Sequence, residues 1–354
     1  MEYVSGQIWS PQGFWEGHIG FEEGKVVEVG KGRARRSIAQ GVILPTLVDA
    51  HTHIVDYVVP VDMGLSLAEV VAPPHGLKYR MLAQTPLERQ REAASYISEF
   101  MLRKGISAFA DFREGSVEGA KVLAAAKGAR PFIMGKTRTP RFDREEVLSL
   151  LEAVDGVGPS AISDWDYGEL RELSQLVHAR GKAFALHCSE RVREDIDKVL
   201  DLRPDYLIHM CQATDGDLEA CAKEGVPIVV CPRSNMFFGL PTPLARMVRA
   251  GVTVALGTDN AMISLPDMFV EMEFAGRLLR AQGVRQVDTV IGMAVCNGRK
   301  IINESPLIEI DPGRPCDFMV VRGHGGDPVT DVVLRTAGID PLMVCVGRER
   351  RGPP

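Results

Sequence analysis

The chain has 354 residues, of which 45% are hydrophobic and 25% are charged, and its formal net charge is −6. This is an ordinary globular composition, and the lack of a long basic run argues against nucleic acid as a partner. No run of 18 apolar residues and no basic N-terminal leader is present, so we expect neither a membrane span nor a secretory signal. The seven cysteines, an odd number placed mostly in apolar runs, favour free thiols in a reducing compartment, and therefore the cytoplasm.

The first 42 residues have the pattern of short strands joined by turns. Candidate strands lie at 7–9, 17–21 and 25–29, and the last of these alternates between apolar and polar residues. Period-two alternation is typical of a strand with one buried face. The N-terminal part therefore predicts a small β structure.

From Ile43 to about Ala294, short apolar runs alternate with longer segments of helical period. Eight strands are predicted, at 43–50, 106–111, 131–136, 159–163, 183–188, 206–210, 226–231 and 252–258. Eight strand–helix repeats over about 250 residues indicate an α/β fold of the (β/α)₈ TIM barrel type. An open, doubly wound sheet is the alternative, but no Gly-x-Gly-x-x-Gly follows the first strand.

After Ile302 the pattern returns to short strands, at 317–321 and 342–346. We predict that residues 1–42 and 303–350 form one composite domain, a small β-sandwich built from both termini. On this division the barrel covers residues 43–302, and residues 351–354 form a tail.

Two histidines follow each other closely at the end of the first barrel strand. Residues i and i+2 of a strand point to the same face, so His51 and His53 should project together. In a TIM barrel the C-terminal ends of the strands form the mouth of the active site. Two neutral imidazoles placed there would form half of a metal site.

Three further strands end on a potential ligand: His187, His209 and Asp259 each close an apolar run. Any one of these residues alone is explained by a polar side chain capping a strand. Together they are not, because four of the eight histidines of the chain then lie at the C-terminal ends of predicted barrel strands.

These segments share their order and spacing with a known family. They are ILPTLVDAHTH at 43–53, LHCSE at 186–190, IH at 208–209, CPRSN at 231–235 and GTDN at 257–260. The chain resembles the amidohydrolase superfamily, in particular the branch with S-adenosylhomocysteine, guanine and cytosine deaminases and triazine hydrolases. Segment 310–318 is similar to that family's return into its β domain. Thr46 departs from the family, which usually has glycine there, and the segment after the first strand is shorter than in many members.

The resemblance implies a role for each residue at the strand ends. His51, His53, His187 and Asp259 would bind one divalent metal, with zinc expected and Fe²⁺ as the alternative. Such a site leaves a position open for water, whose pKa the metal lowers towards about 7. Asp259 would accept the proton of that water, and His209 would contact the water or the reacting group. Glu190 would be the proton shuttle.

A single metal is favoured over a pair. Dinuclear relatives bridge two metals with a carboxylated lysine at the end of the fourth strand. The predicted fourth strand, with GPSAIS at 158–163, has no lysine, and Lys136 ends the third strand instead. Lys136 is therefore better explained as a substrate contact.

Other candidates for substrate binding lie at or beyond strand ends. They are Arg113, Lys136, Arg138, Trp165 and Arg233. Several cations at one rim would suit an anionic or carbonyl-bearing substrate, and Trp165 could stack on a planar ring. His75, in the segment after the first strand, could reach the mouth of the site or belong to a solvated turn.

We therefore expect a metal-dependent deaminase of a small aminated heterocycle, such as a purine, pyrimidine, pterin or nucleoside. Metal-bound hydroxide would attack the ring carbon and ammonia would leave. The alternatives are hydrolysis of a cyclic amide, another C–N bond or a carbon–halogen bond, and, in another class, an inactive barrel that serves as a binding or scaffold protein. No nucleic acid or membrane partner is expected, and assembly into a homo-oligomer is left open.

Overall fold

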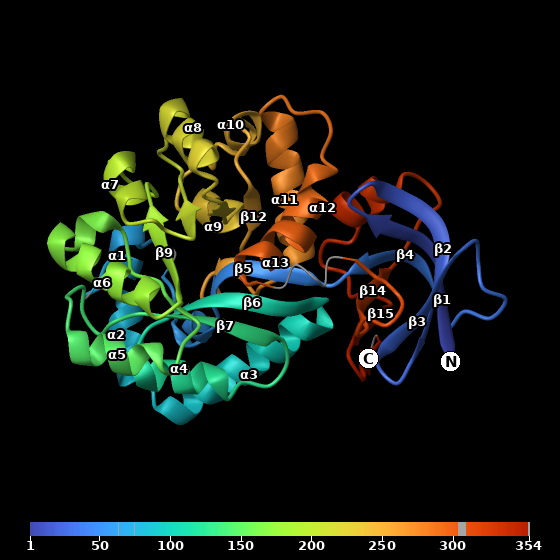
Figure 1. Ribbon diagram of the computed structural model, residues 1–354, viewed down its shortest axis with the longest axis horizontal. Helices are drawn as coiled ribbons and strands as arrows, with labels where there is room; N and C mark the ends of the chain where they lie inside the picture. The colour runs from blue at the N-terminus through green and yellow to red at the C-terminus, as the bar shows by residue number, and fades with distance from the viewer. Residues whose placement is uncertain (63, 74, 304–308, 353–354) are drawn as a thin grey trace. The chain divides into compact units, whose positions relative to one another are not determined.

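The computed structural model describes residues 1–352 except 63, 74 and 304–308 (Figure 1). The chain divides into two compact units. The first consists of Met1–Val48, Phe100–Ala108 and Asp267–Pro354, and the second of Asp49–Glu99 and Phe109–Pro266. The polar strand ends singled out above all belong to the second unit.

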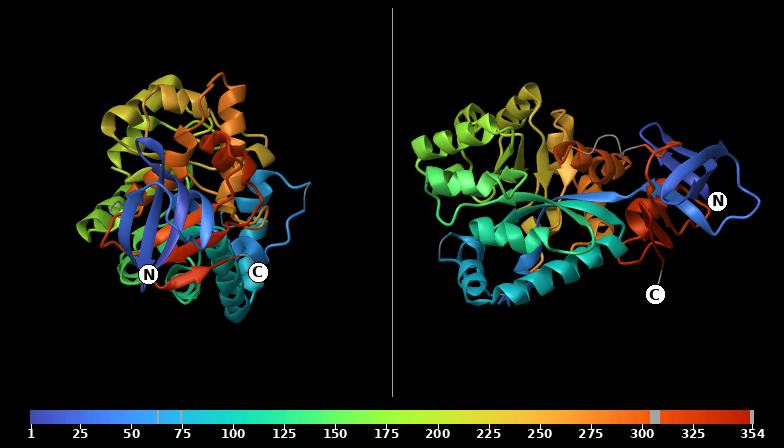
Figure 2. Two further views of the ribbon diagram at one scale, coloured as in Figure 1. Left: turned by 90° about the vertical axis from the view of Figure 1, so that its right-hand side faces the viewer. Right: turned by 60° about the horizontal axis from the view of Figure 1, so that its bottom comes forward.

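The first unit contains a seven-stranded sheet to which both ends of the chain contribute (Figure 2). Its strands are β1 (Glu2–Ser10), β2 (Gly13–Glu22), β3 (Lys25–Lys31), β4 (Ala39–Pro45), β14 (Asp317–Val321), β15 (Met343–Val346) and β16 (Glu349–Arg351). Their order is β16-β15-β14-β4-β1-β2-β3. Ile8, Ile19 and Phe318 lie in the apolar core of this sheet. The predicted strands of both termini are thus found, in one sheet.

Thr46, which departs from the family pattern, lies in a buried polar network of the first unit. Its hydroxyl is 2.5 Å from Asp317 Oδ1 and 2.6 Å from Ser107 Oγ. The buried Arg299 donates to Thr46 Oγ1 and is 2.7 Å from Asp317 Oδ2. A hydroxyl at this position is therefore bonded on several sides, which explains how the site accommodates threonine.

A nine-stranded sheet carries the candidate site at the ends of its strands. The strands are β5 (Leu47–His53), β6 (Ile106–Arg113), β7 (Arg130–Gly135), β8 (Gly156–Val157), β9 (Ala183–Cys188), β10 (Tyr206–His209), β11 (Ile228–Val230), β12 (Val254–Leu256) and β13 (Asp259–Asn260). The order is β12-β11-β10-β9-β8-β7-β6-β5-β13. Its two outermost strands, β12 and β13, are separated by only two residues, so the sheet curls round towards itself. This mostly parallel sheet is consistent with a TIM barrel.

Helices alternate with these strands and cover the outside of the sheet (Figure 1). In the second unit they are α1 (Leu67–Val71), α2 (Leu77–Gln84), α3 (Leu87–Arg103, which runs into the first unit), α4 (Ser116–Ala124), α5 (Arg144–Leu151), α6 (Tyr167–Ala179), α7 (Ile196–Asp201), α8 (Asp215–Glu224), α9 (Pro232–Phe237) and α10 (Leu244–Arg249). The first unit holds α11 (Met268–Ala281), α12 (Thr289–Gly292), α13 (Gly298–Ile301) and α14 (Pro328–Thr330).

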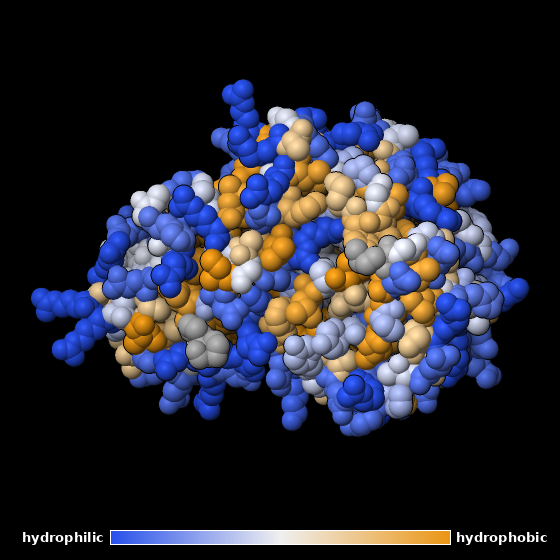
Figure 3. Space-filling model, turned by 180° about the vertical axis from the view of Figure 1, so that it is seen from behind, coloured by the Kyte–Doolittle hydropathy of each residue, from blue (hydrophilic) through white to orange (hydrophobic). Residues whose placement is uncertain are grey.

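Helix α6 shows why these segments are helical. Its buried residues include Leu170, Leu173 and Val177, which share one face at helical spacing, and Asp166 caps its first turn by accepting the Glu169 N–H. None of the described helices is long and apolar enough to cross a membrane. On the face shown in Figure 3, hydrophilic and hydrophobic residues are interspersed.

Two of the predicted barrel strands differ from the structure. The fourth is not at 159–163 but is the short β8, Gly156–Val157, and residues 162–164 form a 3₁₀ turn. Pro159 lacks the N–H that a ladder needs, which explains why the strand ends before it. The first predicted strand, 43–50, is interrupted at Thr46, so that β4 belongs to the seven-stranded sheet and β5 to the nine-stranded one.

Candidate active site

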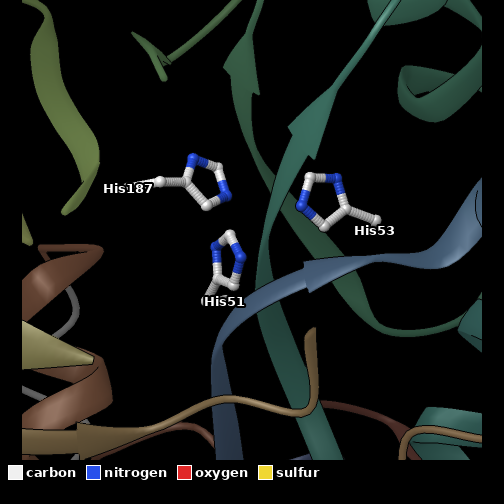
Figure 4. A group of neighbouring side chains, drawn as sticks. All are labelled: His51, His53 and His187. Atoms are coloured by element: carbon white, nitrogen blue, oxygen red, sulfur yellow. The ribbon is translucent and has the colours of Figure 1, made fainter. Parts of the chain in front are cut away.

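Five side chains from four strands converge in the second unit. His51 and His53 lie at the end of β5 and face His187 of β9 (Figure 4). The potential ligand atoms of these three histidines lie within 4.8 Å of one another. The same holds for a second group formed by His51, His209 of β10 and Asp259 of β13. His51 belongs to both groups, so the predicted metal ligands and His209 form one cluster.

Two imidazoles of this cluster, His51 and His187, are held neutral. Burial is the main cause that lowers the pKa of His51 to about 3. Burial also holds the pKa of His187 well below its usual value, and neighbouring cationic groups act in the same direction. A neutral imidazole keeps a free lone pair on one nitrogen, which is the form that binds a metal.

Neighbouring groups orient the ligand candidates. His187 Nδ1 lies 3.2 Å from the carbonyl oxygen of Pro159, which can only accept, so Nδ1 carries the proton and Nε2 is the free nitrogen. Asp259 Oδ2 accepts from Ser234 Oγ at 2.5 Å and from Asn260 Nδ2 at 3.1 Å. Its other oxygen, Oδ1, faces His51 Nε2 at 3.5 Å. Although burial opposes it, the neighbouring His51 imidazole holds the pKa of Asp259 well below its usual range.

The cluster fits a divalent metal. Both ring nitrogens of the buried His51 lack a hydrogen-bond partner among the described residues. Unpartnered buried nitrogens are costly in a folded protein, and metal coordination is one way to satisfy them. Three or four imidazoles and one carboxylate are a donor set that suits zinc or Fe²⁺.

Glu190 lies beside the cluster, as its sequence position predicts. Its Oε1 is 3.5 Å from His209 Nε2 and 3.3 Å from Asn235 Nδ2. Asn235 Nδ2 also lies 3.1 Å from His209 Nδ1, so this residue of α9 braces both side chains. Burial raises the pKa of Glu190. A carboxyl group that holds its proton more tightly is suited to act as an acid.

The backbone is strained where it places these residues. Positive φ angles occur at Ser189 (47°), His209 (75°), Met210 (55°) and Asp259 (63°). Residues other than glycine rarely adopt such angles, and they persist where the surrounding structure enforces them, often at functional sites. Strained backbone therefore coincides with the ends of β9 and β10 and the start of β13, where the candidate residues lie.

A buried charge cluster lies behind His53, and the sequence did not reveal it. Lys78 Nζ of α2 is 2.8 Å from Asp56 Oδ2, 2.8 Å from Glu114 Oε1 and 3.0 Å from His53 Nδ1. The Lys78 ammonium can only donate, so His53 Nδ1 accepts from it, and Glu114 Oε1 lies 3.6 Å from the same nitrogen. Glu114 could have been noticed, because it follows a strand end directly. Nothing in the sequence shows where α2 places Lys78.

Two connected chambers open at the site. The inner chamber is lined by His53, His187, Glu190, His209 and Asp259 and, on its other sides, by residues of α1, α2 and the loops after β8 and β9. The outer chamber is lined by, among others, Arg113, Arg138 and Trp165. Lys136 lines both chambers.

The remaining candidates lie in different places. Arg113 is buried and donates to the Glu114 carbonyl and to Gln90, whereas Arg138 is exposed and pairs with Glu146. Two further candidates do not line either chamber. Arg233 contacts Ser264 Oγ, and His75 is exposed.

The chain was compared with protein families and curated proteins. Residues 42–347 match the family described as the amidohydrolase family. The chain is 31% identical over 346 residues to a protein of Methanothermobacter thermautotrophicus named as an aminohydrolase, and the match covers 89% of each chain. It is 27% identical over 320 residues to a 5-methylthioadenosine/S-adenosylhomocysteine deaminase of Haloarcula marismortui, covering 78% of this chain and 70% of that one.

Solved structures share the fold at low sequence identity. An adenosine deaminase from Xanthomonas campestris with bound zinc has a TM-score of 0.80 at 17% identity, covering 98% of this chain and 92% of that one. A zinc complex of an atrazine chlorohydrolase from Arthrobacter aurescens has a TM-score of 0.78 at 16% identity, covering 99% and 95%. At these identities the likeness establishes the fold alone.

Proposed function

The chain belongs to the amidohydrolase family, and we propose that it is a deaminase that replaces an exocyclic amine of a nitrogen heterocycle by oxygen. Family membership and the aminohydrolase and deaminase relatives make it a hydrolase of C–N bonds. The histidine cluster is consistent with a divalent metal. We propose specifically that it deaminates the ring of a purine, pyrimidine, pterin or nucleoside.

The metal would be held by His51, His53, His187 and Asp259, and zinc is the metal that we propose. Zinc-bound structures of the same fold and the mixture of imidazole and carboxylate donors are consistent with this choice. When bound, the metal supplies Lewis acidity and lowers the pKa of water at neutral pH. We further propose a mononuclear site, because Val157, which ends β8, and the residues after it offer no lysine to bridge a second ion.

The chain's own residues account for the proton movements of deamination. Asp259 accepts a proton from the attacking water through Oδ1, since Oδ2 is occupied by Ser234 and Asn260. Glu190 donates a proton to the ring nitrogen next to the attacked carbon, and later a proton passes to the departing amine. His209 hydrogen-bonds the oxygen on which charge develops. The net reaction consumes one water and yields a lactam and ammonia.

The position of Glu190 is the observation that carries this proposal. Its carboxyl group lies in the inner chamber beside His209, and burial raises its pKa, so it can serve as an acid towards a ring nitrogen. An acyclic amide has no ring nitrogen to protonate. Several relatives are named as 5-methylthioadenosine/S-adenosylhomocysteine deaminases, and these names support the same reaction class.

We also propose a domain division and a set of substrate contacts. The nine-stranded sheet with its helices would be the closed (β/α)₈ barrel, covering residues 43–302. The sheet built from both termini would form the small sandwich domain of residues 1–42 and 303–350. Arg113, Lys136, Arg138, Trp165 and Arg233 are proposed as substrate contacts. Arg113, Lys136, Arg138 and Trp165 line a chamber, which favours them over Arg233.

The test is an ammonia-release screen over aminated purines, pyrimidines, pterins and nucleosides, with zinc-loaded and iron-loaded protein assayed in parallel. We expect at least one ring to lose an amine, and mass spectrometry to show that oxygen replaced it. The Glu190→Gln variant is the control for activity from a contaminating enzyme. Ring opening by addition of a whole water, or loss of halide, would contradict deamination and favour the hydrolytic alternatives.

A further inference from the structure

The inner and outer chambers meet at a short common wall. Pro73, Tyr79, Lys136 and Ser160 line both of them. The inner chamber has a cavity volume of about 170 Å³ and the outer one about 650 Å³. A molecule whose reacting end lies beside Glu190 would therefore have its far end at this shared wall. Lys136 is the one of these four residues with a charged side chain.

Among the described residues, the ammonium of Lys136 has only distant polar partners. Only 12% of its side chain is exposed. Its polar contacts are Tyr79 Oη at 3.4 Å and Glu114 Oε1 at 3.5 Å, both longer than the 2.7–3.2 Å of a good N–H···O bond. An ammonium has three donors to place, and a nearly buried one is costly without close acceptors.

Glu114 is only a weak partner of Lys136, because it already forms a closer ion pair with Lys78. Lys78 Nζ is 2.8 Å from Glu114 Oε1, the same oxygen that Lys136 reaches at 3.5 Å. Lys78 is also 2.8 Å from Asp56 Oδ2. Burial acts to lower the pKa of Lys136, but the neighbouring Tyr79 and Glu114 outweigh it and raise the pKa, so the side chain stays protonated. A cation with spare donors thus faces the passage between the chambers.

We propose that Lys136 binds an oxyanion of the substrate, so that the substrate is an aminated heterocycle whose substituent carries a carboxylate or a phosphate. This inference rests on the proposed deamination, and it adds the acidic group. The ring would occupy the inner chamber, next to Glu190 and His209, and the acidic group would lie at the common wall. Tyr79 Oη offers a second donor to the same group.

The outer chamber accommodates the rest of such a substituent. Arg113, Lys136 and Arg138 line it together with the acidic Glu114 and Glu118, while Glu114 is paired with Lys78 and Arg138 with Glu146. Lys136, whose acidic contact is long, and Arg113 therefore supply the positive charge that an anion would meet at this end. The inner chamber has Glu190 beside the histidine cluster, where the ring would react, so the acidic group would lie at the other end of the substrate.

Paired ligands that differ only in the acidic group test the proposal. The probes are pterin with pterin-6-carboxylate, and adenosine with adenosine 5′-monophosphate. Binding to the full-length, zinc-loaded chain is measured by calorimetry, and ammonia release is measured separately. We expect an acid-bearing probe to bind about 10- to 100-fold more tightly than its neutral partner, as for a charge-assisted hydrogen bond. The pair that shows the preference distinguishes a carboxylate from a phosphate.

Three variants attribute the preference to Lys136. Lys136→Met should remove the preference, whereas Lys136→Arg, which keeps the charge, should retain part of it. Lys121→Met is the matched control, because Lys121 is exposed on α4 and does not line either chamber. Circular dichroism and zinc content confirm that each variant is folded and loaded.

Equal binding of both members of each pair, or a preference that survives in Lys136→Met, would overturn the inference. Failure of the proposed function is a different result. An acid-dependent preference that needs Lys136, without ammonia release from any probe or heterocycle, would support anion binding and contradict deamination. Ammonia release from neutral heterocycles, with no preference for acidic ones, would support deamination and contradict anion binding by Lys136.

Discussion

The active site has two halves that are built in different ways. In one half, His51, His187, His209 and Asp259 lie at strand ends, where the register of the sheet fixes them. In the other half, the segment after β5, which includes α1 and α2, lines the inner chamber and is fastened by side chains. The ion pairs of Lys78 with Asp56 and Glu114 hold this segment in place.

The strand half carries the proposed reacting groups, whereas the segment half shapes the chamber that selects the substrate. Backbone ladders hold the strand half, so a substitution there changes the reacting groups with little effect on their placement. The segment half depends on a buried ion pair and on a capped five-residue helix, α1, so substitutions there should change stability or local mobility first. Four predictions, in order of decreasing effect, test this division.

Removing a ligand candidate from the strand half should have the largest effect. We expect one divalent ion per wild-type chain, and a large loss of metal together with loss of turnover in His187→Ala and Asp259→Asn, because both side chains face the cluster. Elemental analysis of protein purified without chelators measures the content. His75→Ala, at an exposed histidine, is the control. Two ions per wild-type chain would contradict the mononuclear site, and full metal content in both variants would contradict the ligand assignment.

Replacing the proposed proton shuttle should lower the rate and leave the metal in place. Glu190→Gln removes the titratable proton but keeps the shape of the side chain, and general acid–base catalysis is typically worth about 10²- to 10⁴-fold. We expect a loss of this size in kcat with unchanged metal content. Glu219→Gln, at an exposed position of α8, is the matched control. Near-normal kcat in Glu190→Gln would show that another group transfers the proton.

In the segment half, Lys78→Met should reduce stability. The side chain of Lys78 is only 4% exposed, and its removal leaves Asp56 without its cation and Glu114 with only the longer contacts to Lys136 and Arg113. Breaking a buried ion pair from one side costs about 3–5 kcal/mol of unfolding free energy. Denaturant titration measures the loss, and adding Asp56→Asn to Lys78→Met should recover part of it. Arg89→Met, which breaks an exposed pair with Glu92, should change stability by less than about 1 kcal/mol. An equally small change in Lys78→Met would show that the segment is held by other contacts.

The same division explains what the sequence could predict. Strand ends carry a local signal: alternation places His51 and His53 on one face, and an apolar run before His187 or Asp259 marks the end of a strand. The fourth strand was misplaced because β8 has only two residues, too few for a pattern to appear. Lys78 was missed because its partners Asp56 and Glu114 come from different parts of the chain, and such contacts depend on tertiary packing, which no local pattern encodes.

The smallest effect should come from the cap of α1, which forms part of the inner chamber wall. Ser66 and Glu69 form a capping box: the Ser66 hydroxyl accepts the Glu69 N–H, and the Glu69 carboxylate accepts the Ser66 N–H at 2.8 Å. Loss of an N-cap costs about 1 kcal/mol, which corresponds to about fivefold more frequent opening of a helix that unfolds locally. Ser66→Ala should therefore accelerate hydrogen exchange at the amides of Val70 and Ala72, which bond to Ser66 and Ala68 carbonyls, while amides of β9 stay unchanged. Ser149→Ala, at an exposed position inside α5, is the matched control.

Since Leu67, Ala68 and Val71 line the chamber, Ser66→Ala should weaken ligand binding more than it lowers metal content. Unchanged exchange in α1 would show that packing, rather than its cap, holds this wall, and acceleration that spread into β9 would show that the two halves of the site open together.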